Sequence, residues 1–101
     1  MIVVRNIFRL KFGKAREAVA AWKEGLVIAE RGGIPRGTWR LLTDLVGPDF
    51  YTLVLEGTYP SLAEFEQSAK ATMGNPEWQS WYPRITALCE GGHREILNVV
   101  E

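Results

Sequence analysis

The sequence predicts an α+β fold in which four antiparallel strands form one sheet and helices cover one of its faces. Two observations carry this prediction. Four segments alternate apolar and polar residues, as strands with one buried face do, and the segments between them repeat apolar residues at spacings of three and four, as amphipathic helices do. The segments follow the order strand, helix, strand, strand, helix pair, strand, which is typical of the ferredoxin-like split βαβ arrangement.

The first strand is predicted in residues 2–12, where Asn6 is the only polar residue on an otherwise apolar face. Gly13 ends it. A helix follows from Lys14 to about Arg31, because an apolar stripe runs along it and Gly32-Gly33 is a typical helix end. The stripe consists of Ala15, Ala18, Val19, Trp22, Leu26 and Ala29.

The second and third strands are predicted from about Arg36 to Val46 and from Phe50 to Tyr59, joined by the turn sequence GPD. The next segment, SLAE at residues 61–64, fits a capping box and opens a helix that Gly74 closes.

Asn75-Pro76 starts another helix, since asparagine caps well and proline suits the first helical position. Its apolar stripe consists of Trp78, Trp81, Ile85 and Leu88. Pro83 lies within this helix and is expected to bend it. Gly91-Gly92 then precedes a final strand from His93 to Val100.

Composition places the chain among globular proteins and excludes several functional classes. The 101 residues form one predicted domain, residues 1–101, and the 12 basic and 12 acidic residues cancel, which argues against nucleic-acid partners. Cys89 is the only cysteine and His93 the only histidine, so neither a disulfide, a metal site nor a cofactor is predicted. No apolar run approaches the ~20 residues of a membrane span, and the N-terminus is unlike a signal peptide, so a cytoplasmic setting is expected.

The sheet face away from the helices also carries apolar residues, among them Val3 and Ile7. Such residues argue for a protein partner rather than water on that face. The simplest arrangement is a symmetric homodimer that stacks the two sheets.

Three stretches resemble the NIPSNAP family. They are LKFGKAREAVAAWKEGL, YPSLAEFEQSAKATMGNPEWQSWYPRI and the closing REIL, and the resemblance covers residues 2–97. This family belongs to the dimeric α+β-barrel superfamily, which includes the antibiotic-biosynthesis monooxygenases. The resemblance implies a homodimer in which two four-stranded sheets close into a barrel, and it implies no particular reaction. Members often carry a tryptophan two residues before the tyrosine of the YxSL segment, where this chain has Gly57.

Asn6 and His93 are the candidate catalytic residues. A buried amide needs hydrogen-bond partners, and the cofactor-independent monooxygenases of this superfamily resemble the chain in using an asparagine of the first strand. Asn6 could therefore orient a carbonyl or stabilise an enolate-like oxyanion, or it could be a structural amide. His93 could be a general base, or it could be an ordinary exposed residue at the start of a strand.

Aromatic residues are the candidate ligand-binding residues. On the last helix Trp81 and Tyr82, beside Trp78, could stack on a planar ligand or could fill the core or a dimer interface. Gly57 could leave room in a cavity or could mark a β-bulge. The other candidates for such a cavity are Trp22, Trp39, Tyr51 and Tyr59.

Two pairs of arginines, Arg36 with Arg40 and Arg5 with Arg9, could each present two guanidinium groups to a carboxylate. Alternatively, they could be solvated or could pair with acids of a partner chain, such as Asp44 or Glu56.

Three functions fit these observations. The first is a homodimer that binds an apolar or aromatic small molecule between sheet and helices. The second is a cofactor-independent monooxygenase or isomerase acting on an enolisable aromatic or polyketide-like substrate. The third is an interaction module whose cavity is filled by its own side chains.

Overall fold

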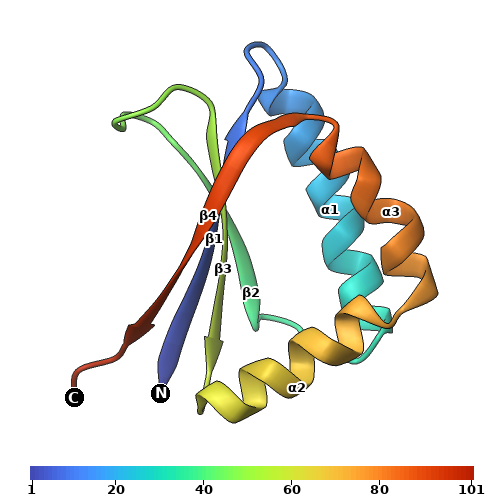
Figure 1. Ribbon diagram of the computed structural model, residues 1–101, viewed down its shortest axis with the longest axis vertical. Helices are drawn as coiled ribbons and strands as arrows, with labels where there is room; N and C mark the ends of the chain where they lie inside the picture. The colour runs from blue at the N-terminus through green and yellow to red at the C-terminus, as the bar shows by residue number, and fades with distance from the viewer.

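The computed structural model describes residues 1–101, and its elements follow the predicted order (Figure 1). They are β1 (Ile2–Leu10), α1 (Ala15–Arg31), β2 (Trp39–Thr43), β3 (Thr52–Tyr59), α2 (Leu62–Met73), α3 (Pro76–Thr86) and β4 (Cys89–Asn98). The predicted fold class is confirmed.

The strands form one antiparallel sheet in the order β2-β3-β1-β4. All three helices lie on the same side of this sheet (Figure 1). Residues that face each other across neighbouring strands share a face of the sheet, so the register decides which side chains meet. Asn6 stands opposite Leu55 of β3 and Arg94 of β4, and all three therefore lie on the helix side.

The β2–β3 connection is longer than the sequence predicts. β2 is confined to Trp39–Thr43 instead of residues 36–46, and β3 begins at Thr52. The carboxylate of Asp44 accepts a hydrogen bond from the Thr52 amide at 2.7 Å, which holds the loop. Tyr51 has a φ of 58°, in the left-handed region, so it cannot extend β3.

The last strand begins at Cys89, earlier than the predicted His93, and Gly91-Gly92 is part of it rather than a break. The reason is close approach of two backbones. A Cβ atom on Gly92 would lie 2.7 Å from the carbonyl oxygen of Ile7 in β1. Glycine therefore allows β4 to pair with β1 where a side chain would collide.

The helix starts are as predicted. The hydroxyl of Ser61 accepts a hydrogen bond from the Glu64 amide at 3.2 Å, and the side chain of Asn75 accepts one from the Glu77 amide at 2.9 Å. No helix is both long enough and apolar enough to cross a membrane.

The main core lies between α1, α3 and the centre of the sheet, and its most deeply buried side chains are Trp22, Leu53 and Ile85. α1 and α3 approach closely where the indole of Trp81 lies on Gly25, and the indole nitrogen of Trp81 donates a hydrogen bond to the Ala21 carbonyl at 3.0 Å. Only a residue without a side chain fits beneath this indole.

We expect Gly25→Ala to destabilise the protein, although alanine favours helix by about 1 kcal/mol over glycine. The added methyl group would overlap the Trp81 indole, and overpacking of a core costs about 1–3 kcal/mol, so the net change should be a loss of stability. Urea unfolding measures it. Gly91→Ala, where nothing lies within 4 Å of the added carbon, is the control, and an unfolding midpoint for Gly25→Ala above that of the wild type would contradict the packing argument.

Candidate functional site

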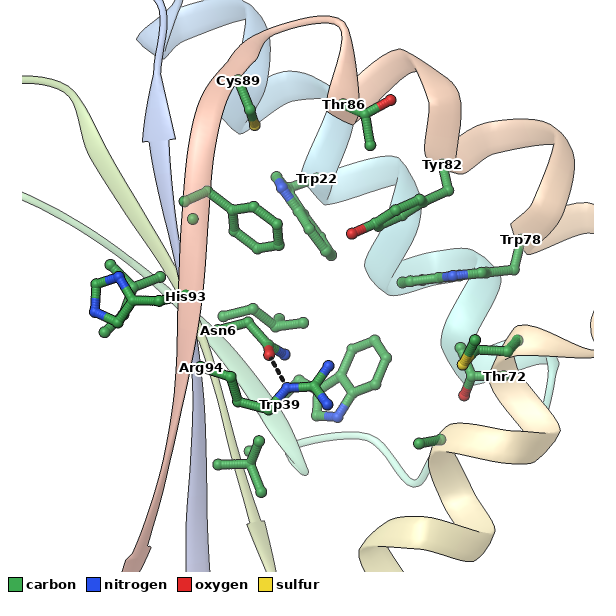
Figure 2. Close-up of a pocket in the computed structure, with 18 of the residues that line it drawn as sticks. Asn6, Trp22, Trp39, Thr72, Trp78, Tyr82, Thr86, Cys89, His93 and Arg94 are labelled. Carbon is green, nitrogen blue, oxygen red and sulfur yellow. Dashed lines mark hydrogen bonds between the residues drawn. The ribbon is translucent and has the colours of Figure 1, made fainter.

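A cavity of about 910 Å³ lies between the helix-side face of the sheet and the three helices (Figure 2). β1, β3 and β4 contribute its floor, while α2 and α3 form the opposite wall. Its lining is mainly apolar and aromatic. The aromatic residues are Phe8, Trp22, Trp39, Tyr59, Phe65, Trp78 and Tyr82.

Trp78 and Tyr82, one turn apart on α3, form part of the wall. Their rings are stacked, with centroids 5.9 Å apart and an angle of 22° between the planes. The rings of Trp39 and Trp78 pack edge-to-face, with centroids 5.7 Å apart. In Figure 2 the phenol of Tyr82 points into the space between α3 and the sheet.

Trp39 is held in place from two directions. Its indole nitrogen donates a hydrogen bond to the hydroxyl of Tyr59 at 2.7 Å. Its ring lies over Gly57, where a Cβ atom would be 2.9 Å from the Trp39 ring. The register of β1 with β3 is unbroken past Gly57, so the bulge alternative is wrong. Gly57 makes room for the ring of Trp39.

The polar floor of the cavity is a pair of side chains. Arg94 donates a hydrogen bond from Nε to the Oδ1 atom of Asn6 at 2.6 Å, and Figure 2 shows the guanidinium directed toward the helices. The same guanidinium lies 5.4 Å from the centroid of the Phe65 ring, within the range of a cation–π contact. Asn6 is therefore bonded to a residue of β4, and its amide oxygen is occupied.

His93 is among the residues that line the cavity, but its imidazole points away from it. It stands opposite Ile7, not Asn6, so its side chain lies on the other face of the sheet, as Figure 2 shows. There its imidazole is 3.8 Å from the carboxylate of Glu95. The two candidate catalytic residues thus lie on opposite faces, because they occupy neighbouring rather than facing positions of two paired strands.

The family follows from comparison with known proteins. The sequence profile of the NIPSNAP family matches residues 5–101. The chain belongs to the NIPSNAP family. No curated protein matches it.

Solved structures agree on the fold. A NIPSNAP family protein from Agrobacterium tumefaciens superposes with a TM-score of 0.86 at 24% identity, covering 99% of this chain and 93% of that one. An uncharacterised NIPSNAP domain protein from Burkholderia xenovorans gives 0.83 at 22% identity, with coverages of 99% and 95%. SnoaB, a cofactor-independent oxygenase from Streptomyces nogalater, gives 0.66 at 11% identity, with coverages of 99% and 93%. At these identities the likeness concerns the fold alone.

In this NIPSNAP domain the six predicted aromatic ligand-binding residues divide into two groups. Four of them line the cavity, namely Trp22, Trp39, Tyr59 and Tyr82. Trp81 is buried against α1 instead, and Tyr51 lies in the β2–β3 loop with its ring 5.3 Å from that of Phe12.

Trp22 lines the cavity but is almost completely buried, and its indole nitrogen is shielded and donates to no acceptor. That unsatisfied donor costs stability, whereas the indole of Trp81 is satisfied.

Arg94 is the residue that sequence reasoning missed. It lies within the predicted last strand, and no local pattern distinguishes it there. The signal is its cross-strand position opposite Asn6, which requires the pairing of the first and last strands to be known. Phe65 and Thr72 of α2 were also missed, because only the path of α2 along the sheet brings them to the cavity.

The ionisable groups of the cavity wall favour their protonated forms. Burial raises the pKa of the Tyr82 phenol above its ordinary value of 10.0; Cys89 raises it further, and Arg94 lowers it. Burial also raises the pKa of the Cys89 thiol above 9.0, against a smaller lowering by Lys11. At neutral pH both groups are therefore uncharged, and neither is an activated nucleophile. No group of three His, Cys, Asp or Glu residues is placed to hold a metal ion.

The raised pKa of Tyr82 predicts a loss of stability at alkaline pH. The folded state holds the phenolic proton more tightly than the unfolded state does. The contribution of Tyr82 to the free energy of unfolding is therefore fully present below pH 10.0, and it is lost as the pH rises from 10.0 through the folded-state pKa. We expect Tyr82→Phe to show a shallower fall between about pH 9 and about pH 11, measured by urea unfolding at each pH. Tyr51→Phe is the control and should keep the steeper, wild-type fall. Equal slopes for wild type and Tyr82→Phe would contradict the assignment.

Proposed function

We propose that this protein binds an apolar or aromatic small molecule in the cavity between its sheet and helices. The observation that carries the proposal is the cavity itself, with a volume of about 910 Å³ beside the stacked rings of Trp78 and Tyr82. Ligand sites for small organic molecules have volumes of about 300–1,000 Å³ and mostly apolar linings with a few polar groups.

The cavity is also held open. Trp39 lines it, and the hydrogen bond to Tyr59 together with the position of the indole over Gly57 fixes this large ring against the sheet. An interaction module with a self-filled cavity, the third function considered from the sequence, has no need of such an arrangement.

A single unpaired cysteine, Cys89, suits the reducing cytoplasm in which we place the protein.

Binding without turnover is favoured over the monooxygenase or isomerase alternative. Both reactions begin with removal of a proton from an enolisable substrate. Tyr82 and Cys89 are protonated at neutral pH, Glu90 is paired with Arg9 at 3.7 Å, and His93 lies on the far face. Asn6 is in place to bind a carbonyl or oxyanion, but a proton acceptor is not beside it.

We also propose that the protein is a homodimer through the sheet face opposite the helices. One cross-strand row on that face alternates in charge through all four strands: Arg40 of β2, Glu56 of β3, Arg5 of β1 and Glu95 of β4. The flanking rows are mostly apolar, with Leu42, Val54 and Ile7 beside His93 in one and with Val3 and Leu97 beside Thr58 in the other.

This row is complementary to itself in one orientation. If a two-fold axis runs parallel to the strands, the partner presents the row in reverse order, and each arginine faces a glutamate. An axis perpendicular to the strands would place like charges together. In addition, the β2–β3 loop projects from the side of the sheet away from the helices (Figure 1), and Leu45, Val46 and Phe50 on it are 97%, 92% and 77% exposed. Exposed apolar groups of this size favour a protein partner on that side.

Filling the cavity should abolish binding of a neutral aromatic probe. We expect N-phenyl-1-naphthylamine to bind the wild type with a rise in fluorescence, and Ala69→Trp to weaken it by about tenfold or more, because an indole at this lining position excludes the probe. Ala63→Trp, on the exposed side of the same helix, is the matched control and should bind as the wild type does. No binding to the wild type, or equal loss in both variants, would overturn the proposal.

A charge on the outer sheet face should dissociate the dimer. We expect the wild type to sediment at twice the 11.4 kDa chain mass and Leu97→Glu to sediment as a monomer, because the new carboxylate would be buried without a partner. Val27→Glu is the control. Leu97 and Val27 are 46% and 48% exposed, but Val27 lies on α1. Analytical ultracentrifugation distinguishes the outcomes, and a monomeric wild type would refute the dimer.

A further inference from the structure

Arg94 is the one side chain that brings an uncompensated charge into the cavity. Arg94 forms no ion pair. The arginines and lysines that do form one are Arg9, Lys14, Arg31, Arg40 and Arg84. Its only hydrogen bond is the one from Nε to Asn6. Both terminal nitrogens of the guanidinium are therefore without a protein acceptor.

The cavity holds no negative charge that would neutralise this guanidinium. Of the two other ionic residues that line it, Glu90 is paired with Arg9 and His93 is turned to the opposite face (Figure 2). The ring of Phe65 lies 5.4 Å from the guanidinium, and the rings of Trp78 and Tyr82 line the same cavity. A free guanidinium at the edge of an aromatic surface is matched by a ligand that joins an anion to an apolar body.

The hydrogen bond to Asn6 also sets the direction of the free nitrogens. Because Nε is fixed by Oδ1 at 2.6 Å, the guanidinium plane is oriented and its two terminal N–H groups form a fork. Such a fork fits the two oxygens of a carboxylate. The amide nitrogen of Asn6 makes no hydrogen bond within the protein and is a further donor beside the same position.

We propose that the ligand of this cavity is an aromatic monocarboxylic acid, whose carboxylate pairs with Arg94 and whose ring system lies against Trp78 and Tyr82. This inference rests on the proposed small-molecule function and names its ligand class. Arg94 is the anion-binding residue, and Asn6 is the positioning residue that orients it.

Two naphthalene compounds of nearly equal size separate the charge from the apolar body. 1-Naphthylacetate carries a carboxylate and 1-naphthylacetamide a neutral amide, and their affinities are measured by isothermal titration calorimetry at neutral pH. For the wild type we expect the acid to bind about five- to tenfold more tightly than the amide, as for a charge-assisted pair that is open to solvent.

Single substitutions then show which residues cause the preference for the acid over the amide. Arg94→Gln should bring the ratio of the two affinities to about one while changing the affinity for the amide less than about twofold. Asn6→Asp, which keeps the shape, should also abolish the preference, because the new carboxylate would neutralise Arg94 in place of the ligand. Arg36→Gln removes the same charge from an exposed loop and should keep the wild-type ratio.

The outcomes separate the two proposals. If the wild type binds acid and amide equally, the cavity binds small molecules but the carboxylate inference is wrong. If Arg94→Gln still prefers the acid to the amide, the carboxylate inference is also wrong, since another cation must then be responsible. If the wild type binds N-phenyl-1-naphthylamine but neither of these compounds, this inference is wrong and the proposed function stands; if it binds none of the three, both are wrong.

Discussion

The contact between Gly25 of α1 and the indole of Trp81 on α3 is the constraint on which the cavity depends. It allows the two helix backbones to approach closely, and the hydrogen bond from Trp81 to the Ala21 carbonyl fixes the indole between them. The pair is thereby a rigid unit that meets the sheet through Trp22 and Ile85. Trp81 is buried in this contact and does not reach the cavity, whereas Trp78 and Tyr82, on the neighbouring face of α3, line the cavity wall.

The sheet contributes a second constraint, which is polar. Asn6 interrupts an apolar strand face, and a half-buried amide there must find a partner. Its partner is Arg94, across the β1–β4 ladder and near Gly92, which allows the two strands to approach closely. The result is a hydrogen-bonded pair on an otherwise apolar floor. The bond satisfies the oxygen of the half-buried amide, while the terminal nitrogens of Arg94 stay open to the cavity.

The elements could be predicted because each has a local cause. Alternation in β1, the serine cap at Ser61 and the Asn75-Pro76 start are all visible within a few residues of sequence. The errors come from interactions between distant residues. Gly91-Gly92 is a typical strand break by itself, and only the closeness of Ile7 shows that it belongs to a strand.

The same distinction explains the site. Asn6 was identified because it breaks a local pattern, and the cavity aromatics because they are large. The sequence alone could not identify Arg94 or tell on which face His93 lies, because the face of each residue on β4 depends on its register with β1. A shift of one residue in that register would exchange the positions of Arg94 and His93.

The two faces of the sheet are consequently chemically separate. On the helix side Arg94 has no ion-pair partner, while on the other side Arg5 stands between Glu56 and Glu95, and Arg40 pairs with Glu56 at 3.2 Å. The row on the outer face thus alternates basic and acidic residues, whereas the guanidinium on the helix side has no acidic neighbour across the strands. Because alternate residues of β1 and β4 supply the two faces, the outer face and the cavity use different side chains of the same strands. A substitution on one face therefore need not alter the other.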